Sequence, residues 1–131
     1  MMRAHRITTE DQALIDRASE LARRRLSERT SVAVALRTKD KRIFQGVNIE
    51  VSGSAPCSFC AEYAAVGAMV SEGAFEISTI VAVSGKKHVV LPPCGKCRQL
   101  LREFGNPYVI LQLRGRHVKV RLADLYPVQV T

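Results

Sequence analysis

Three cysteines and one glutamate stand at spacings that suit a hydrolytic zinc site. Cys60 and Glu62 are separated by one alanine, and Cys94 and Cys97 form a CxxC pair. A catalytic zinc ion takes three protein ligands and keeps a fourth position for water, whereas a structural zinc ion takes four protein ligands. We therefore predict that Cys60, Cys94 and Cys97 bind Zn²⁺ and that Glu62 is the catalytic residue that moves protons.

The predicted chemistry is the attack of an activated water on an electrophilic carbon, with Glu62 carrying the water proton to the leaving group. Three thiolates would leave the zinc cluster with net negative charge, so positive charge is expected close by. Lys96 and Arg98 are candidates for that charge, and Gln99 is a further hydrogen-bond donor in the same segment.

A fourth cysteine leaves a structural alternative open. Cys57 and Cys60 form a second CxxC pair, so four thiolates could close a structural zinc site in a basic protein that binds nucleic acid. The glutamate has no role in such a site. Cys57 is otherwise a spare loop thiol.

The net charge of +8 gives only weak support for a nucleic-acid partner. Short basic runs, such as Arg23 to Arg25, are typical of solvated helix ends and turns. Aromatic residues, which would stack on bases, make up only 5% of the chain, and tryptophan is absent. Nucleic acid is therefore not the expected partner.

Apolar periodicity predicts an α/β fold built on one mixed sheet of about five strands, with helices on its faces. A helix is expected from about residue 9 to 26, with a capping box that opens at Thr9, and the almost wholly apolar strand 77–83 should be central. The other expected strands are 32–36, 43–49, 109–113 and 118–122, and the other expected helices are 60–72, the segment from Pro93 to Phe104, and a final turn at 122–125.

This element order places the three zinc-binding thiols at the starts of two helices. Free N–H groups and the positive end of the dipole at a helix start favour the thiolate over the thiol. The helix after Cys60 carries alanines on one face and should lie close to the sheet.

Length and composition predict a single domain over residues 1–131. Apolar residues make up 47% of the chain and charged residues 24%, which is typical of globular proteins. The longest apolar runs are shorter than a membrane span, and the first residues lack the apolar segment of a signal peptide. We therefore expect a cytoplasmic protein without membrane contact, in which CxxC pairs favour metal binding over disulfides.

With these motifs in order along the chain, the sequence resembles the cytidine deaminases and, within that superfamily, the blasticidin S deaminases. The combination of three cysteine ligands with a glutamate that is not a ligand is a described signature of zinc deaminases. The resemblance runs from about Asp11 to Pro127 and is carried by four segments: Gly46 to Glu50, Cys60 to Glu62, Val70 to Gly73, and Pro93 to Gln99.

The resemblance implies a cytidine deaminase-like fold, a three-layer α/β/α sandwich, and assembly as a homotetramer. It assigns zinc to Cys60, Cys94 and Cys97 and proton transfer to Glu62. It further implies that Asn48 and Glu50 bind the sugar hydroxyls of a nucleoside substrate.

Three departures from the cytidine deaminase pattern concern the choice of substrate. Tyr63 stands where tetrameric cytidine deaminases usually have an arginine, which blasticidin S deaminases also lack. Residues 29–31 and 126–131 contain none of the phenylalanines that commonly enclose the base. The loop from Glu50 to Cys60 is also one residue longer than expected.

The predicted function is the zinc-dependent removal of an exocyclic amine from cytidine, deoxycytidine or a related aminopyrimidine nucleoside, which gives the uracil form and ammonia. Such an enzyme would belong to pyrimidine salvage. The enzyme alternative is deamination of a cytosine nucleoside antibiotic of the blasticidin S type, and the alternative of another class is the four-cysteine protein that binds nucleic acid.

Overall fold

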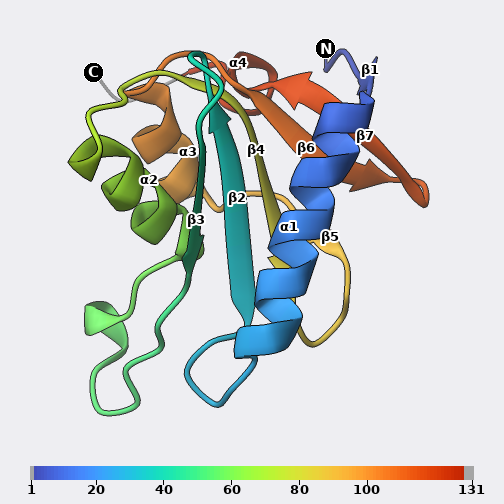
Figure 1. Cartoon of the computed structure of the whole chain (residues 1–131). Coiled ribbons are helices and arrows are strands. Elements are labelled where there is room, and N and C mark those ends of the chain that lie inside the picture. The colour runs from blue at the N-terminus through green and yellow to red at the C-terminus, as the bar shows by residue number, and fades with distance from the viewer. Residues whose placement is uncertain (1, 129–131) are drawn as a thin grey trace.

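A seven-stranded mixed sheet forms the centre of the computed structural model, which describes residues 2–128 (Figure 1). The order along the sheet is β1-β7-β6-β4-β2-β3, and β5 pairs with β4 outside this path. The β4–β6 pair is parallel and the remaining pairs are antiparallel. The strands are β1 (His5–Arg6), β2 (Val32–Thr38), β3 (Ile43–Val47), β4 (Ile77–Ser84), β5 (Val90–Leu91), β6 (Tyr108–Leu113) and β7 (Arg116–Arg121).

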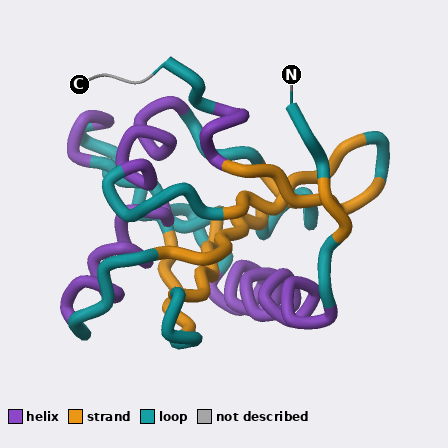
Figure 2. Tube along the Cα trace, turned by 90° about the horizontal axis from the view of Figure 1, so that it is seen from above, coloured by secondary structure: helices purple, strands orange, loops and turns teal. Residues whose placement is uncertain are grey.

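Helices cover both faces of this sheet. Figure 2 shows α1 on one side of the strands and the other α-helices on the opposite side. The helices are α1 (Thr9–Arg25), the short 3₁₀ helix η1 (Ala55–Cys57), α2 (Ala61–Ser71), α3 (Gly95–Arg102) and α4 (Leu122–Leu125). The expected three-layer α/β/α sandwich is confirmed.

Two buried apolar clusters fill the spaces between the layers. One joins α1 to β2 and β4 and includes Leu14 and Val81, and the other joins α2, α3 and α4 to the opposite face and includes Met69 and Leu101. The two clusters take alternate residues of β4, whose residues from Thr79 onward are all buried. The expected central strand is therefore confirmed.

The expected count of five strands is wrong by two. The additional strands, β1 and β5, have two residues each and pair through two residue contacts each, with β7 and β4 respectively. A two-residue strand is too short to show an alternating apolar pattern, so its existence depends on the neighbouring strand.

The capping box of α1 begins one residue earlier than expected. Thr8 is the N-cap: its Oγ1 accepts a hydrogen bond from the Asp11 N–H at 3.1 Å, and the Asp11 carboxylate accepts one from the Thr8 N–H at 2.9 Å. Aspartate closes the box in place of the usual Glu or Gln.

Asp11 also joins α1 to two strands. Its buried carboxylate accepts hydrogen bonds from Arg37 of β2 at 2.9 Å and from Lys119 of β7 at 2.8 Å. Burial alone would raise the pKa of Asp11, but the bonds from Lys119, Thr8 and Arg37 lower it to about 2. This network fixes the start of α1 against the sheet.

The close approach of α2 to the sheet is confirmed at Gly46 of β3. A Cβ atom at Gly46 would lie 2.7 Å from the Ala64 Cβ atom and would also overlap the backbone nitrogen of Ala65. Gly73, with φ of +80°, ends the turn after α2, as the sequence predicts.

Within residues 2–128, none of the helices is both long enough and apolar enough to cross a bilayer.

Candidate active site

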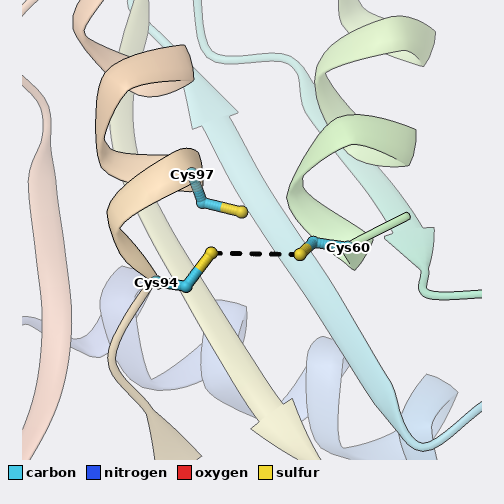
Figure 3. A group of neighbouring side chains, drawn as sticks. All are labelled: Cys60, Cys94 and Cys97. Atoms are coloured by element: carbon cyan, nitrogen blue, oxygen red, sulfur yellow. Dashed lines mark hydrogen bonds between the residues drawn. The ribbon is translucent and has the colours of Figure 1, made fainter. Parts of the chain in front are cut away.

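The sulfur atoms of Cys60, Cys94 and Cys97 converge between the starts of two helices. Cys60 is the N-cap of α2, Cys94 is the N-cap of α3, and Cys97 lies in the first turn of α3. Figure 3 shows the three sulfurs pointing toward one another from the two helices. The Sγ atoms of Cys60 and Cys94 are 4.0 Å apart, and all three Sγ atoms lie within 4.8 Å of one another.

This spacing fits a zinc ion. Zn–S bonds of about 2.3 Å in tetrahedral geometry place ligand sulfurs about 3.8 Å apart. The cluster could hold a metal ion with three thiolates and leave a fourth position for water.

A short strand positions the half of the cluster that comes from α3. Pairing of Val90 and Leu91 with Val83 and Ala82 holds the chain against β4 just before the Pro92-Pro93 segment. Arg98 then donates from its backbone N–H to the Cys94 carbonyl at 2.9 Å, which closes the first turn of α3.

The three thiols resist simultaneous ionisation in the absence of a cation. Burial raises the pKa of Cys97 far above that of a free thiol, and the charge of Glu62 adds to this rise. Burial also raises the pKa of Cys60. Burial opposes ionisation of Cys94 as well, but hydrogen bonds from the Cys97 backbone and from the other two thiols lower its pKa. A bound divalent cation would stabilise the three thiolates and so allow all three thiols to lose their protons.

Glu62 lies in the first turn of α2 with a side chain that is only 6% exposed. Burial raises its pKa above the ordinary glutamate value, although interaction with the Cys97 thiol partly opposes the rise. A raised pKa brings a carboxyl group closer to the operating pH, which favours its use as a general acid and base.

Glu62 and the three thiols line one cavity of about 340 Å³ together with Asn48 and Glu50. The structure therefore brings together all six residues that the sequence singled out. The remaining wall is largely apolar and includes Val32, Ile49, Phe59, Ala82 and Leu91.

The Asn48 amide is fixed by the backbone of β2. Its Oδ1 accepts hydrogen bonds from the N–H groups of Ser31 at 2.8 Å and Val32 at 2.9 Å. Asn48 lines the cavity, and no hydrogen-bond partner of its NH₂ group is found among the residues that the structure describes. Glu50 follows two residues later, where its backbone N–H donates to the Arg29 carbonyl at 2.8 Å and no side-chain partner is found among residues 2–128.

The residues expected to supply compensating charge and hydrogen bonds also hold the surrounding structure. Arg98 donates to the carbonyls of Pro93 at 2.9 Å and Leu125 at 2.8 Å, which ties α3 to α4. Lys96 lies over the Tyr63 ring, with its Nζ 4.8 Å from the ring centroid. Gln99 accepts a hydrogen bond from the Tyr126 hydroxyl at 2.6 Å.

Cys57 lies apart from the metal cluster. It is exposed in η1, and its Sγ contacts the Ser54 hydroxyl at 3.4 Å. In the described part of the chain, the group of thiols close enough to share an ion contains Cys60, Cys94 and Cys97 and leaves Cys57 out. The four-cysteine structural site therefore lacks its fourth ligand.

The comparison that decides the family covers most of the chain. A family model for the cytidine and deoxycytidylate deaminase zinc-binding region matches residues 8–113. The chain belongs to this deaminase family. Cytidine deaminases are hydrolytic enzymes, so the predicted class of enzyme is confirmed, and zinc as its cofactor agrees with the family description and with the three-thiol cluster.

Relatives of known name support the same family. Blasticidin-S deaminase from Bacillus cereus is 30% identical over 139 aligned residues, which cover 99% of both chains. Cytidine deaminase from Mycobacterium tuberculosis H37Rv is 36% identical over 101 residues, which cover 76% of this chain and 71% of that protein.

Solved deaminase structures have the same fold. The crystal structure of cytidine deaminase from Mycobacterium tuberculosis matches with a TM-score of 0.78 and 29% identity, covering 95% of this chain and 99% of that chain. The cytidine deaminase from Burkholderia pseudomallei matches with a TM-score of 0.75 and 30% identity, covering 95% of this chain and all of that chain.

The apolar wall of the deaminase cavity was not predicted. The phenylalanines that commonly enclose the base in cytidine deaminases were expected near 29–31 and 126–131, where the sequence has none, and residues 129–131 lie outside the described part of the chain. Phe59, directly before Cys60, lines the cavity. The sequence feature that could have indicated a place in the cavity for Phe59 is its position directly before Cys60.

Proposed function

We propose that this chain deaminates cytidine and deoxycytidine, or a closely related aminopyrimidine nucleoside, to the uracil form with release of ammonia. The observation that carries the proposal is the shared cavity, in which a buried carboxylate and three converging thiols face the fixed amide of Asn48. Family membership supports the reaction class, and the residue roles below are part of the proposal.

Cys60, Cys94 and Cys97 would hold the zinc ion. When bound, zinc lowers the pKa of a water molecule so that it becomes a nucleophile near neutral pH. The starts of α2 and α3 favour the thiolate forms of these ligands, since the helix dipoles place partial positive charge there.

Glu62 would move the protons of the reaction. Its carboxylate takes a proton from the attacking water and delivers it to ring nitrogen N3 as the C–O bond forms at C4. The second proton of the water then passes through the carboxylate to the exocyclic amine, so that the C–N bond breaks and a carbonyl is left at C4. Ammonia carries away the amine nitrogen. The raised pKa of Glu62 supports this exchange, because the group gives up its proton less readily than an exposed glutamate.

Asn48 and Glu50 would bind the sugar. The Asn48 NH₂ group donates to a hydroxyl oxygen, because its Oδ1 is already occupied by two backbone N–H groups. Glu50 accepts a hydrogen bond from a sugar hydroxyl. The two residues flank Ile49, so one short segment supplies both groups.

A substrate panel tests this assignment. Ammonia release is measured from cytidine, deoxycytidine, free cytosine and blasticidin S with zinc-loaded protein. The proposal expects turnover of both nucleosides and little or none of free cytosine. Preference for the free base would refute the role given to Asn48 and Glu50.

A cytosine nucleoside antibiotic of the blasticidin S type is the second candidate substrate. Two observations favour it: the end-to-end match to the Bacillus cereus blasticidin-S deaminase, and Tyr63 at the position of the arginine typical of tetrameric cytidine deaminases. Turnover of blasticidin S alone in the same panel would select this candidate.

We also propose a homotetramer, on the basis of the family resemblance. Light scattering of the purified protein tests this assembly directly.

A further inference from the structure

Phe59 is a large apolar side chain that is partly exposed at the cavity of the proposed active site. Its side chain is 40% exposed and lines the cavity that holds the three thiols and Glu62. Among the described residues that line this cavity, Phe59 is the only aromatic one. We propose that Phe59 forms the face against which the substrate base stacks and so determines the preference for a flat heterocycle, an inference that rests on the proposed nucleoside deaminase function.

The backbone at Phe59 is fixed by pairing with the segment that would bind the sugar. Phe59 and Ile49 form an antiparallel bridge, with N–H to carbonyl distances of 3.0 and 3.1 Å in the two directions. The Ser58 hydroxyl accepts a hydrogen bond from the Val51 N–H at 2.8 Å, which adds a second tie. The aromatic ring is therefore carried by a paired segment rather than by a free loop.

The bridge places Phe59 between the two ends of the proposed substrate. Cys60 follows it directly, so the reacting carbon of the base must lie close to this point of the chain. Its bridge partner, Ile49, stands between Asn48 and Glu50, which would hold the sugar. Ile49 and Phe59 both line the cavity together with Asn48, Glu50 and Cys60, so a base held between the two ends lies beside this bridged pair.

The chemistry of the cavity wall supports stacking over hydrogen-bonded recognition at this position. The neighbouring wall residues Val32, Ala82 and Leu91 are aliphatic and offer no hydrogen-bonding side chain. An aromatic ring attracts any flat base through its π-face, and loss of one base–aromatic contact lowers affinity by about 5- to 150-fold. A ring that is 40% exposed without ligand has surface available for such a contact.

Binding measurements on Phe59 variants test the proposal without depending on turnover. The dissociation constants of uridine and of ribose are measured by calorimetry for zinc-loaded wild type, Phe59→Ala, Phe59→Leu and Phe59→Tyr. We expect Phe59→Ala to weaken uridine binding about 5- to 150-fold and Phe59→Tyr to bind uridine about as tightly as wild type. The affinity of Phe59→Leu should lie between those of Phe59→Ala and wild type. Ribose affinity should change little, because the sugar contacts remain.

Phe75 provides the matched control. It is also an exposed phenylalanine, at 61%, but it lies on a different hollow beside Lys39 and Glu103. Phe75→Ala should leave uridine affinity unchanged, and zinc content should equal that of wild type in every variant.

The outcomes separate this inference from the proposed function. Uridine affinity that is unchanged in Phe59→Ala would overturn the stacking role, as would a change in oligomeric state without a change in affinity. A wild-type protein that binds uridine but deaminates no nucleoside would refute the proposed reaction while the Phe59 result still stands. A wild-type protein that binds no nucleoside would overturn both.

Discussion

At the scale of single residues, the site depends on polar groups whose surroundings limit what each can do. Glu62 is buried next to three thiols, and its raised pKa disfavours the ionised form relative to an exposed glutamate. Asn48 has the oxygen of its amide bonded to the backbone, so its NH₂ group is the end left to bind a ligand. Each of these side chains therefore offers a ligand one kind of interaction: Glu62 can exchange a proton, and Asn48 can donate a hydrogen bond.

Replacement of Asn48 by aspartate should separate sugar binding from folding. Asn48→Asp keeps an oxygen for the Ser31 and Val32 N–H groups but removes the amide donor, so we expect KM for cytidine to rise about tenfold or more. Asn48→Ala removes both functions and should also lower Tm below that of Asn48→Asp. Steady-state kinetics and thermal unfolding measure the two effects. An unchanged KM in Asn48→Asp would contradict the sugar-binding role.

At the scale of elements, α2 and α3 must be placed accurately, because each would supply ligands to the same ion. The contact at Gly46 sets the distance between α2 and β3, and the Asp11 network holds α1, which carries none of the proposed ligands, to β2 and β7. Neither feature touches the proposed substrate. Both can be tested through stability and zinc retention.

Asp11→Asn should destabilise the protein by about 3 kcal/mol, because Arg37 and Lys119 lose the buried carboxylate that pairs with them. Glu10→Gln, at the exposed neighbouring position, is the control and should change stability by less than about 0.5 kcal/mol. Urea unfolding measures both. Equal stability of the two variants would show that the network contributes nothing.

The Asp11 carboxylate should make part of the free energy of unfolding sensitive to acid. Its pKa is about 2 in the folded chain against an ordinary value of 3.8, so the stabilisation is fully present above pH 3.8 and is lost as the pH falls toward 2. The shift corresponds to about 2 kcal/mol. Asp11→Asn should lack this component, so its stability should fall less steeply than that of wild type over this pH range.

Gly46→Ala should destabilise the protein by about 2 kcal/mol and weaken zinc retention, because the added Cβ overlaps the backbone of α2 and displaces the helix that begins after Cys60. Gly67→Ala is the matched control within α2. No atom lies within 4 Å of its added Cβ, so better helix propensity should raise stability by about 0.5 to 1 kcal/mol. Zinc content after dialysis and urea unfolding measure the pair. If Gly46→Ala retains zinc as well as wild type does, the contact at Gly46 does not position the proposed zinc ligand at the start of α2.

At the scale of the whole molecule, the two apolar clusters lie on opposite faces of the sheet, and the metal site is at the edge of one of them. Cys97 is fully buried, whereas Cys94 is exposed and Cys60 is partly exposed. The fold therefore does not depend on zinc for most of its buried apolar surface.

Removal of zinc with a chelator should abolish turnover but leave the far-UV circular dichroism spectrum unchanged, because both clusters remain packed. Tm should fall, since an ion that binds only the folded state stabilises it. Activity should return when zinc is added back to the chelated protein. Loss of secondary structure on chelation would indicate a structural zinc site instead.

The sequence predicted the parts of the molecule that have strong local signals. Motif spacing indicated Cys60, Glu62, Cys94 and Cys97, and apolar runs indicated the five longer strands and all four α-helices. The two short strands were missed because their pairing depends on β4 and β7. Phe59 was missed although it stands directly before Cys60, because its place in the cavity depends on the bridge to Ile49, a contact between segments distant in the sequence.

The most direct test of the central claim is a comparison of wild type and Glu62→Gln in which ammonia release from cytidine and zinc content are measured on the same samples. We predict one zinc per chain in both proteins and a loss of turnover of at least about 100-fold in the variant, the usual contribution of a proton-transfer group. Equal turnover at equal zinc content would contradict it.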